Sequence, residues 1–488
     1  MSGSESTTSL QGEAPVGLRK SLGHLQHLAL CIGFMTPAAT VFIYVPILFM
    51  IGGGFSFIAL LIAFACHIPL TFCYAELGSA YPLAGGEYSV VSRTIHKGYG
   101  FVLIVLQMFM LVVTASVCAM GAGLAAQVIW PGVSAHWVAV AAITFGLVIG
   151  FFDIKESVKV SVTLIVLDVV AVAVVIVLGL MHASDPARLV STTVYDMAGS
   201  AGPLTRQTAF AAISFAFIIF MGYQVALVFS EESKDARRRV GRTVLTTLVT
   251  IGILLLASTA ALFLGTPSLQ TLLTSPTPVS DFVTSLGGST LNKLTQLIVF
   301  VVTFEMMMVF CLYCGRMLWS TARDHAWPGP ISRALATVNP RHRSPWVAVL
   351  VFCAAAIPLV WADVSALAGM MSVLTLTVLG SVALAALFIR FRKDAAPDRY
   401  KMPLWPLPPL VGLAAVAFVL SQQPTDMLWV AGVAAAAAVV YYLTYLRPRR
   451  KTHWVMEDVP DEEPEMLTGT SQIGGLVMSE AHEHDLNG

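Results

Sequence analysis

Two carboxylates lie deep inside apolar stretches of the chain. Asp168 is about 11 residues into the run 157–182 and Glu305 about 12 residues into the run 293–320, or roughly 16 Å along a helix. No lysine or arginine shares that depth. An ionised carboxylate at the centre of a membrane helix costs about 2.5–3.5 kcal/mol even on a lenient scale. Such a group persists where it faces a cavity, binds a cation or holds a proton, or as a neutral carboxyl that hydrogen-bonds a neighbouring helix.

Two apolar runs are interrupted near their middle. The first contains Pro37, which removes an amide donor and disfavours helical geometry at Thr36. The second contains Gly222 between aromatic residues. In lipid, a helix breaks only where its backbone is buried in protein or lines a polar cavity, although a simple proline kink is the alternative. We therefore predict a substrate site formed by Met35, Thr36, Pro37, Ala38, Ala39, Thr40, Phe220, Met221, Gly222, Tyr223 and Gln224.

The elements that position these residues are predicted to be membrane helices. Hydrophobic residues make up 57% of the 488 residues and charged residues 11%, against roughly 45–50% and 25% in soluble domains. The composition excludes several soluble domains and a disordered chain. Because the formal net charge is zero, no global basic field attracts nucleic acid. The lipid bilayer is the expected surrounding.

The apolar runs predict an all-α polytopic membrane protein of twelve transmembrane helices. With the N-terminus inside, 25 of the 28 basic residues fall in cytoplasmic segments, as the positive-inside rule requires. We therefore expect a multi-pass protein of the plasma (inner) membrane, with both termini cytoplasmic. The predicted spans are 22–51, 55–80, 98–128, 134–152, 157–182, 207–231, 240–265, 293–320, 344–361, 365–390, 406–421 and 426–446.

The polar tail 447–488 begins with a basic cluster and continues with an acidic one. The first is RPRRK (447–451), and the second runs from Glu457 to Glu465. A positive anchor followed by a solvated tail is one interpretation, and regulation or lipid contact is the other.

Four ordered motifs resemble those of the amino acid–polyamine–organocation (APC) superfamily of transporters, here in an amino acid permease-like form. They are spread over most of the chain, from the end of the second predicted span to the start of the eleventh. The motifs are ELGSAYPLAGGEY (76–88), FMGYQVALVFSEESKDARRRV (220–240), GRMLWSTARDHAWPGPISR (315–333) with SPW (344–346), and YKMPLWPLPPL (400–410).

The resemblance implies the leucine-transporter fold, with two inverted five-helix repeats, two extra helices and substrate held between broken helices one and six. The repeats are then 22–182 and 207–390, followed by helices eleven and twelve at 406–446. A cytoplasmic N-terminal tail (1–21) and a cytoplasmic C-terminal tail (447–488) flank them. In this arrangement the rings of Phe220 and Tyr223 are expected to cover the ligand.

The chain departs from the family pattern where substrate is expected. The family commonly has Gly-x-Gly in the first break, but Ala38 and Thr40 stand there, and Gln224 replaces a frequent glutamate. Asp168 falls where many proton-coupled members carry a lysine in place of a sodium ion, and Glu305 lies near the same level. The pair could share a proton, accept a metal cation or attract a substrate ammonium group. The substrate is then a small amino acid, a compound whose carboxylate is displaced from the usual position, or an amine that has no carboxylate.

Other residues give weaker indications of a functional site. His67 fits either a proton relay or a hydrogen-bonded packing histidine. All seven cysteines lie in apolar stretches, so we expect neither disulfides nor a metal site. We also find no phosphate loop or dinucleotide fingerprint, and no nucleophile–base constellation, so no bound cofactor or catalytic residue is predicted.

We therefore predict a secondary active transporter, a permease for a small amino acid or organic amine. Its energy source would be a proton or other cation gradient, with Asp168 and Glu305 as coupling residues. A polyamine or monoamine transporter or exchanger is the alternative within this class. An intramembrane enzyme that uses the same two carboxylates as acid and base is the alternative outside it. The sequence does not indicate an oligomeric state.

Overall fold

The computed structural model describes residues 23–83, 85–150, 154–195, 200–233, 235–339, 344–393, 395 and 399–456. The predicted N-terminal tail (1–21) and the acidic stretch Glu457 to Glu465 lie outside the described residues.

The first half of the chain is a series of apolar helices joined by short connections. The helices are α1 (His24–Met35), α2 (Pro37–Ala39), the π-helical η1 (Thr40–Tyr44), α3 (Val45–Gly52), η2 (Gly53–Phe55), α4 (Ser56–Ala80), α5 (Gly86–Thr94), α6 (Lys97–Ile129), α7 (Ala135–Ile149), α8 (Ile154–Met181) and η3 (Pro186–Val190). A two-stranded antiparallel hairpin follows, in which β1 (Val194–Tyr195) pairs with β2 (Ala201–Gly202).

The second half is again helical. Its helices are α9 (Arg206–Ile219), α10 (Val225–Val228), η4 (Ser230–Glu232), α11 (Ala236–Gly265), α12 (Leu269–Thr274), α13 (Pro278–Arg323), α14 (Gly329–Leu335), α15 (Trp346–Ala356), η5 (Ile357–Trp361), α16 (Val364–Phe388), η6 (Ile389–Phe391), α17 (Leu407–Leu420), α18 (Thr425–Tyr441) and the π-helical η7 (Tyr442–Leu446).

Many of these helices are long and apolar enough to cross a membrane. Among the described residues, seven segments meet that criterion, and the first of them, His24–Ala80, covers two of the predicted spans. Four shorter apolar helices lie in further predicted spans. The chain is thus a multi-pass helical membrane protein, while the count of twelve crossings and the inverted repeat stay predictions. The helices follow the predicted runs closely, but α13 begins earlier than predicted, at Pro278, and is kinked at Gly288.

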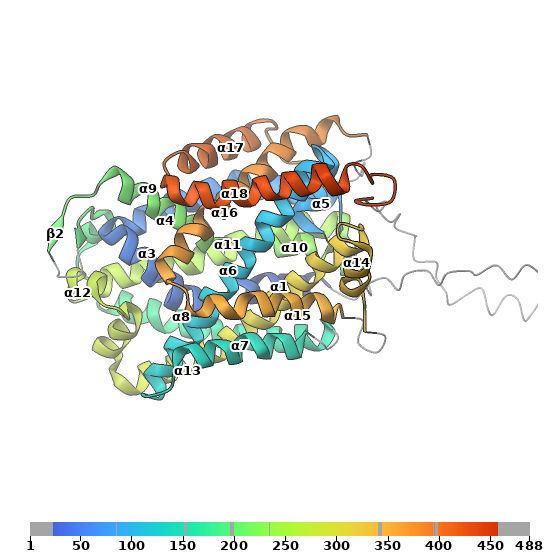
Figure 1. Cartoon of the computed structure of the whole chain (residues 1–488). Coiled ribbons are helices and arrows are strands. Elements are labelled where there is room, and N and C mark those ends of the chain that lie inside the picture. The colour runs from blue at the N-terminus through green and yellow to red at the C-terminus, as the bar shows by residue number, and fades with distance from the viewer. Residues whose placement is uncertain are drawn as a thin grey trace, which may run out of the picture. The chain divides into compact units, whose positions relative to one another are not determined.

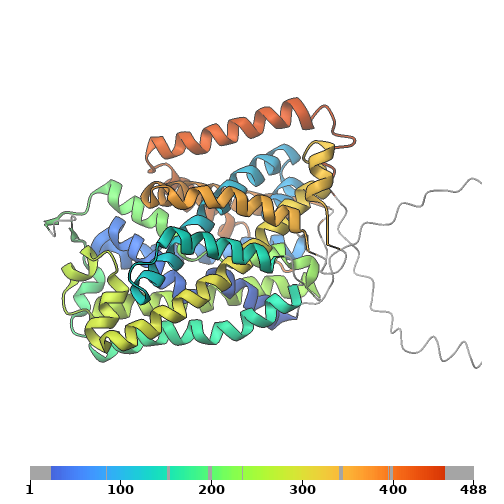
Figure 2. The same ribbon diagram turned by 60° about the horizontal axis from the view of Figure 1, so that its bottom comes forward.

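The connections gather at two ends of the helical bundle. The hairpin and α12 lie at one end, whereas α5 and α14 lie at the other (Figure 1). This is the segregation expected of loops that alternate between two sides of a membrane. Helices α6, α13 and α16 are largely buried, whereas few residues of α18 are buried and this helix runs along the edge of the bundle (Figure 2).

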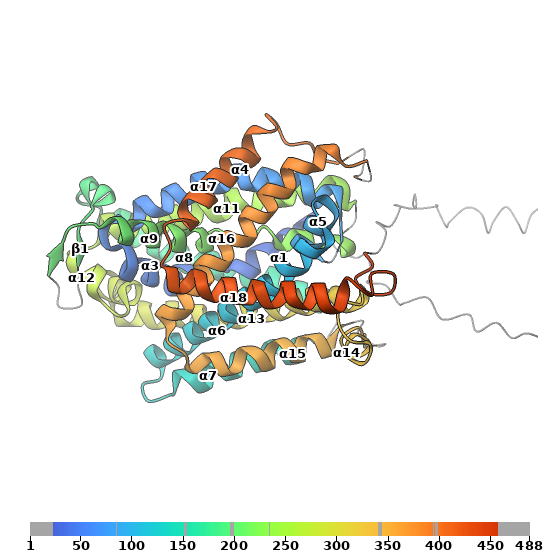
Figure 3. The ribbon, with the colours of Figure 1, turned by 45° about the horizontal axis from the view of Figure 1, so that its top comes forward.

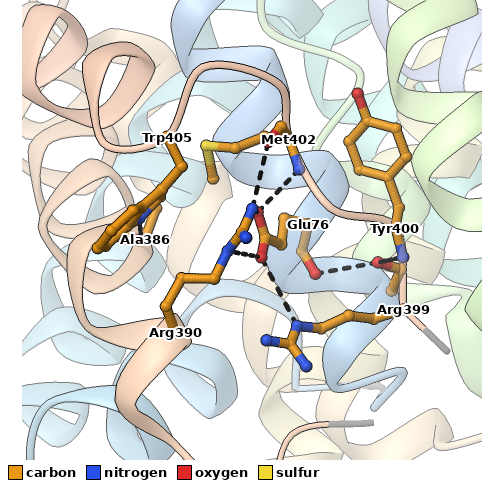
Figure 4. Close-up of polar contacts among 8 residues, drawn as sticks. Glu76, Ala386, Arg390, Arg399, Tyr400, Met402 and Trp405 are labelled. Atoms are coloured by element: carbon orange, nitrogen blue, oxygen red, sulfur yellow. Dashed lines mark hydrogen bonds and ion pairs between the residues drawn. The ribbon is translucent and has the colours of Figure 1, made fainter. Parts of the chain in front are cut away.

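The first family-like motif begins at a buried carboxylate that ties three parts of the chain together. Glu76, at the end of α4, is fully buried, and its Oε1 lies 2.7 Å from Nε of Arg390 and 3.6 Å from Nε of Arg399 (Figure 4). Its Oε2 accepts a hydrogen bond of 2.9 Å from the amide of Met402. A buried carboxylate needs such partners. Glu76 therefore fixes the chain segment that leads into α17.

Candidate functional site

The first predicted span is broken at Thr36. Helix α1 ends at Met35, and Thr36 adopts a left-handed backbone with φ of 42°, which is rare for a β-branched residue. The helical course resumes at Pro37, whose fixed φ and missing N–H suit the first position of a helix. Local strain of this kind concentrates at functional sites, because the surrounding structure must hold it in place.

The second interruption lies in the sixth predicted span. Helix α9 ends at Ile219, and regular α-helix resumes only for the single turn of α10, from Val225. Between them Gly222 has φ of 151°, a conformation that favours glycine. Its amide donates to the side-chain Oε1 of Gln224. The turn is therefore built by the glycine and the amide side chain together.

The two breaks lie against each other. A Cβ atom placed on Gly222 would be 3.1 Å from Cβ of Met35 and 3.4 Å from the carbonyl oxygen of Cys31. Glycine thus permits the close approach of the two chain segments. All eleven predicted substrate-site residues are buried, so the structure brings both predicted halves together and closes them off from solvent.

Two aromatic residues of the sixth-span break turn toward α4. The ring of Phe220 lies 5.3 Å from Phe64, and Tyr223 lies 5.1 Å from Tyr74, as measured between ring centroids. The hydroxyl of Tyr223 is also 2.8 Å from Nδ1 of His67. These contacts join the sixth-span break to α4, and the cover that Phe220 and Tyr223 would form over a ligand stays a prediction. They also give His67 a hydrogen-bonded packing position.

Both deep carboxylates reach the first-span break. Oδ1 of Asp168 accepts a 2.7 Å hydrogen bond from the amide of Ala38, and Oε1 of Glu305 accepts one from the hydroxyl of Ser161. A Cβ atom on Gly33 would lie 2.6 Å from the same Glu305 oxygen. Asp168 therefore stands just after the break and Glu305 just before it.

Each of these carboxylates keeps one oxygen without a hydrogen-bond partner in the described part of the chain, namely Oδ2 of Asp168 and Oε2 of Glu305. Both side chains are about 1% exposed, and no ion pair to either is found among the described residues. Two buried carboxyl groups with spare acceptor atoms can hold a proton or meet a cationic group. No cluster of three or more metal-ligating side chains is found in the described ranges.

Another buried carboxyl group, that of Glu87, was missed by the sequence reasoning. Glu87 lies in α5, outside the predicted spans, and its Oε2 accepts a 3.3 Å hydrogen bond from the hydroxyl of Tyr313. That hydroxyl also accepts from Gln107. Burial raises the pKa of Glu87 to about 7, so this carboxyl changes charge near neutral pH. The only signal in the sequence was its place in the motif at 76–88.

Two ion pairs of the segment after the sixth-span break were also missed. Arg316 of α13 pairs with Glu232 of η4, and both side chains are almost fully buried. Arg323, two turns further along α13, pairs with Glu231 at 3.1 Å. The segment that follows the sixth-span break is thus fixed to the helix that carries Glu305. Sequence spacing gives no signal for pairs so far apart in the chain.

The sequence matches those of known permeases over most of its length. Residues 22–445 match the family described as "Amino acid permease". The Branched-chain amino acid permease BcaP of Lactococcus lactis subsp. cremoris is 22% identical over 434 residues, which cover 82% of this chain and 88% of that protein. The protein of the same name from Bacillus subtilis is 22% identical over 401 residues, which cover 76% of this chain and 80% of that protein.

Proposed function

Because the chain belongs to the amino acid permease family, we propose that it is a proton-coupled secondary transporter of a small amino acid. Membership in a permease family indicates a transporter rather than the intramembrane enzyme considered above. The observation that carries the proposal is the contact between two helix breaks beside two buried carboxylates. Substrate would bind at the breaks, and alternating access would open them to one side at a time. The names of the two relatives make branched-chain amino acids the first substrates to test.

The hydrogen bond from Ala38 to Asp168 supports a specific coupling mechanism. Ala38 lies at the start of a helical segment that continues to Gly52, where the backbone carries partial positive charge. A substrate carboxylate at the same amide would meet the ionised Asp168, and two like charges there repel. A proton on Asp168 removes the repulsion and weakens this residue as an acceptor. Protonation of Asp168 would therefore precede binding of the substrate carboxylate. The proton and the substrate would then cross the membrane together.

The same hydrogen bond favours one alternative substrate class. If Asp168 stays ionised on the Ala38 amide, its free Oδ2 is available to an ammonium group. The substrate would then be an organic amine or polyamine without a carboxylate, carried alone or by exchange. Proton-dependent binding of an amino acid supports the first mechanism, whereas binding of amines alone supports the second.

Replacing Thr40 with tryptophan is expected to abolish substrate binding. Thr40 is fully buried, and its hydroxyl donates to the carbonyl of Met35 across the break, so the larger ring would fill the space between the segments. A thermal-shift titration with leucine, valine and simple amines measures binding, because a ligand at 100 times its Kd stabilises by about 2.7 kcal/mol. Tryptophan at Val433, which faces outward on α18, is the matched control. Undiminished binding by the Thr40→Trp protein would move the site elsewhere.

The proposed orientation places both termini in the cytoplasm. Cysteine introduced at the exposed Ser200, beside the hairpin, should then react with a membrane-impermeant maleimide added to intact cells. Cysteine at the exposed Ala334, in α14, should react only after the membrane is opened. Labelling in the reverse order would invert the topology.

A further inference from the structure

A basic cavity lies where the last membrane helix meets the start of α6. Its volume is about 600 Å³, and it is distinct from the proposed substrate site. Helix α18 and α5 reach the same end of the bundle, and the cavity lies at this end (Figure 3). The residues that line it are His96, Lys97, Tyr442, Leu443, Leu446, Arg447, Arg450, His453 and Trp454.

The charges on this lining have one sign. Lys97, Arg447 and Arg450 are cationic, and no lining residue is acidic. In the part of the chain that the structure describes, none of the three cations forms an ion pair. By contrast, Arg316 and Arg390 each pair with a glutamate. Among the described residues, the positive charge of the cavity is therefore not neutralised.

The walls of the cavity are fixed by tertiary contacts. The indole Nε1 of Trp454 donates a 2.7 Å hydrogen bond to the carbonyl of Lys97, and the indole is almost fully buried. A Cβ atom on Gly98 would lie 2.6 Å from the ring of Tyr442, so glycine lets η7 pack directly on α6. The chain after η7 therefore folds back onto the start of α6 and forms part of the cavity wall.

A positively charged cavity favours an anionic ligand, and the surroundings of this cavity favour a lipid headgroup as that ligand. Few residues of α18 are buried. Val433 and Val440 of this helix and Leu443 of η7 have exposed apolar side chains. An acyl chain can lie along this face while its headgroup reaches the cavity at the end of the helix. Basic pockets between membrane helices on the cytoplasmic side bind anionic headgroups. We propose that this cavity binds the phosphate of an anionic phospholipid, with Arg447 and Arg450 as its principal ligands.

The test compares two double variants that remove equal charge from one pentapeptide. Arg447→Gln with Arg450→Gln removes both guanidinium groups that line the cavity. Arg449→Gln with Lys451→Gln is the control, because neither residue lines the cavity and Arg449 instead lies over the ring of Tyr445. Native mass spectrometry of the purified full-length protein would measure binding of phosphatidylglycerol, phosphatidylcholine and inorganic phosphate.

We expect the cavity variant to bind phosphatidylglycerol about tenfold more weakly than the control, since each basic residue contributes several-fold to anion binding. The unmodified protein should bind phosphatidylglycerol at least tenfold more tightly than phosphatidylcholine or phosphate. If both variants lose the same affinity for phosphatidylglycerol, the lipid is attracted by the positive surface in general. The cavity would then not be its binding site. If inorganic phosphate binds as tightly as phosphatidylglycerol, the cavity recognises free phosphate rather than a lipid headgroup, which would contradict the proposal.

Deletion of residues 457–488 addresses a competing occupant. If the acidic stretch Glu457 to Glu465 fills the cavity, the deletion would raise phosphatidylglycerol affinity about tenfold and assign the cavity to the chain itself. Unchanged affinity supports the lipid. Substrate binding should be the same in every variant, so failure of this proposal leaves the proposed transport function intact.

Discussion

Proton-driven uptake is expected to be lost when Asp168 is replaced by asparagine, while exchange at equilibrium continues. Asparagine keeps an oxygen that accepts the hydrogen bond from Ala38, but it cannot take up and release a proton. The break should therefore keep its shape and lose its coupling. Uptake into proteoliposomes under an imposed pH gradient measures the first activity. Exchange of labelled for unlabelled substrate without a gradient measures the second.

Glu305→Gln is the second variant to compare in this experiment. Its amide keeps an acceptor for the hydroxyl of Ser161 and leaves Asp168 in place, so we expect only a partial loss of proton-driven uptake. If Asp168 instead binds a substrate ammonium group, asparagine at this position should abolish binding as well as uptake. Unchanged proton-driven uptake in Asp168→Asn would leave Asp168 a structural role. Glu87 would then be the next carboxyl group to test.

The single replacement Glu232→Gln is expected to destabilise the protein by about 3–5 kcal/mol, because it leaves Arg316 buried without its counter-charge. Replacing both residues with methionine should restore most of this loss, since apolar groups of similar size tolerate burial. Thermal unfolding in detergent, followed by the exposure of buried cysteines, measures the difference.

An exposed ion pair provides the control for this second prediction. Asp235 and Arg239 are 2.8 Å apart, with side chains 61% and 40% exposed. Pairs of this kind contribute only about 0.2–1 kcal/mol, and asparagine tolerates the left-handed backbone at position 235. Asp235→Asn should therefore shift unfolding only slightly. An equally small shift for Glu232→Gln would show that the pair with Arg316 does not hold the sixth-span break to α13.

The helices could be predicted from the sequence because length and hydropathy determine which segments can cross a bilayer. The break at Thr36 could also be predicted, because Pro37 constrains the chain locally whatever surrounds it. Gly222 was a weaker signal, since glycine is common in membrane helices. Its importance comes from its close approach to Met35, and that contact is a property of the folded chain.

The contacts that give the carboxylates their chemistry could not be predicted. Asp168 meets the amide of Ala38, 130 residues away, and Glu305 meets Ser161, 144 residues away. Hydropathy indicates the depth of a side chain, but not the direction in which it points around its helix. For the same reason, the sequence could not indicate that Tyr223 turns toward His67.

Counterflow in proteoliposomes tests most directly whether this protein is an amino acid transporter that uses the two breaks. Vesicles loaded with unlabelled branched-chain amino acid are diluted into a trace of the labelled compound, with no ion gradient applied. We predict that the wild-type protein accumulates label transiently inside the vesicles and that Thr40→Trp does not. Failure of the wild-type protein to accumulate any amino acid or amine, or equal accumulation by Thr40→Trp, would contradict the proposal.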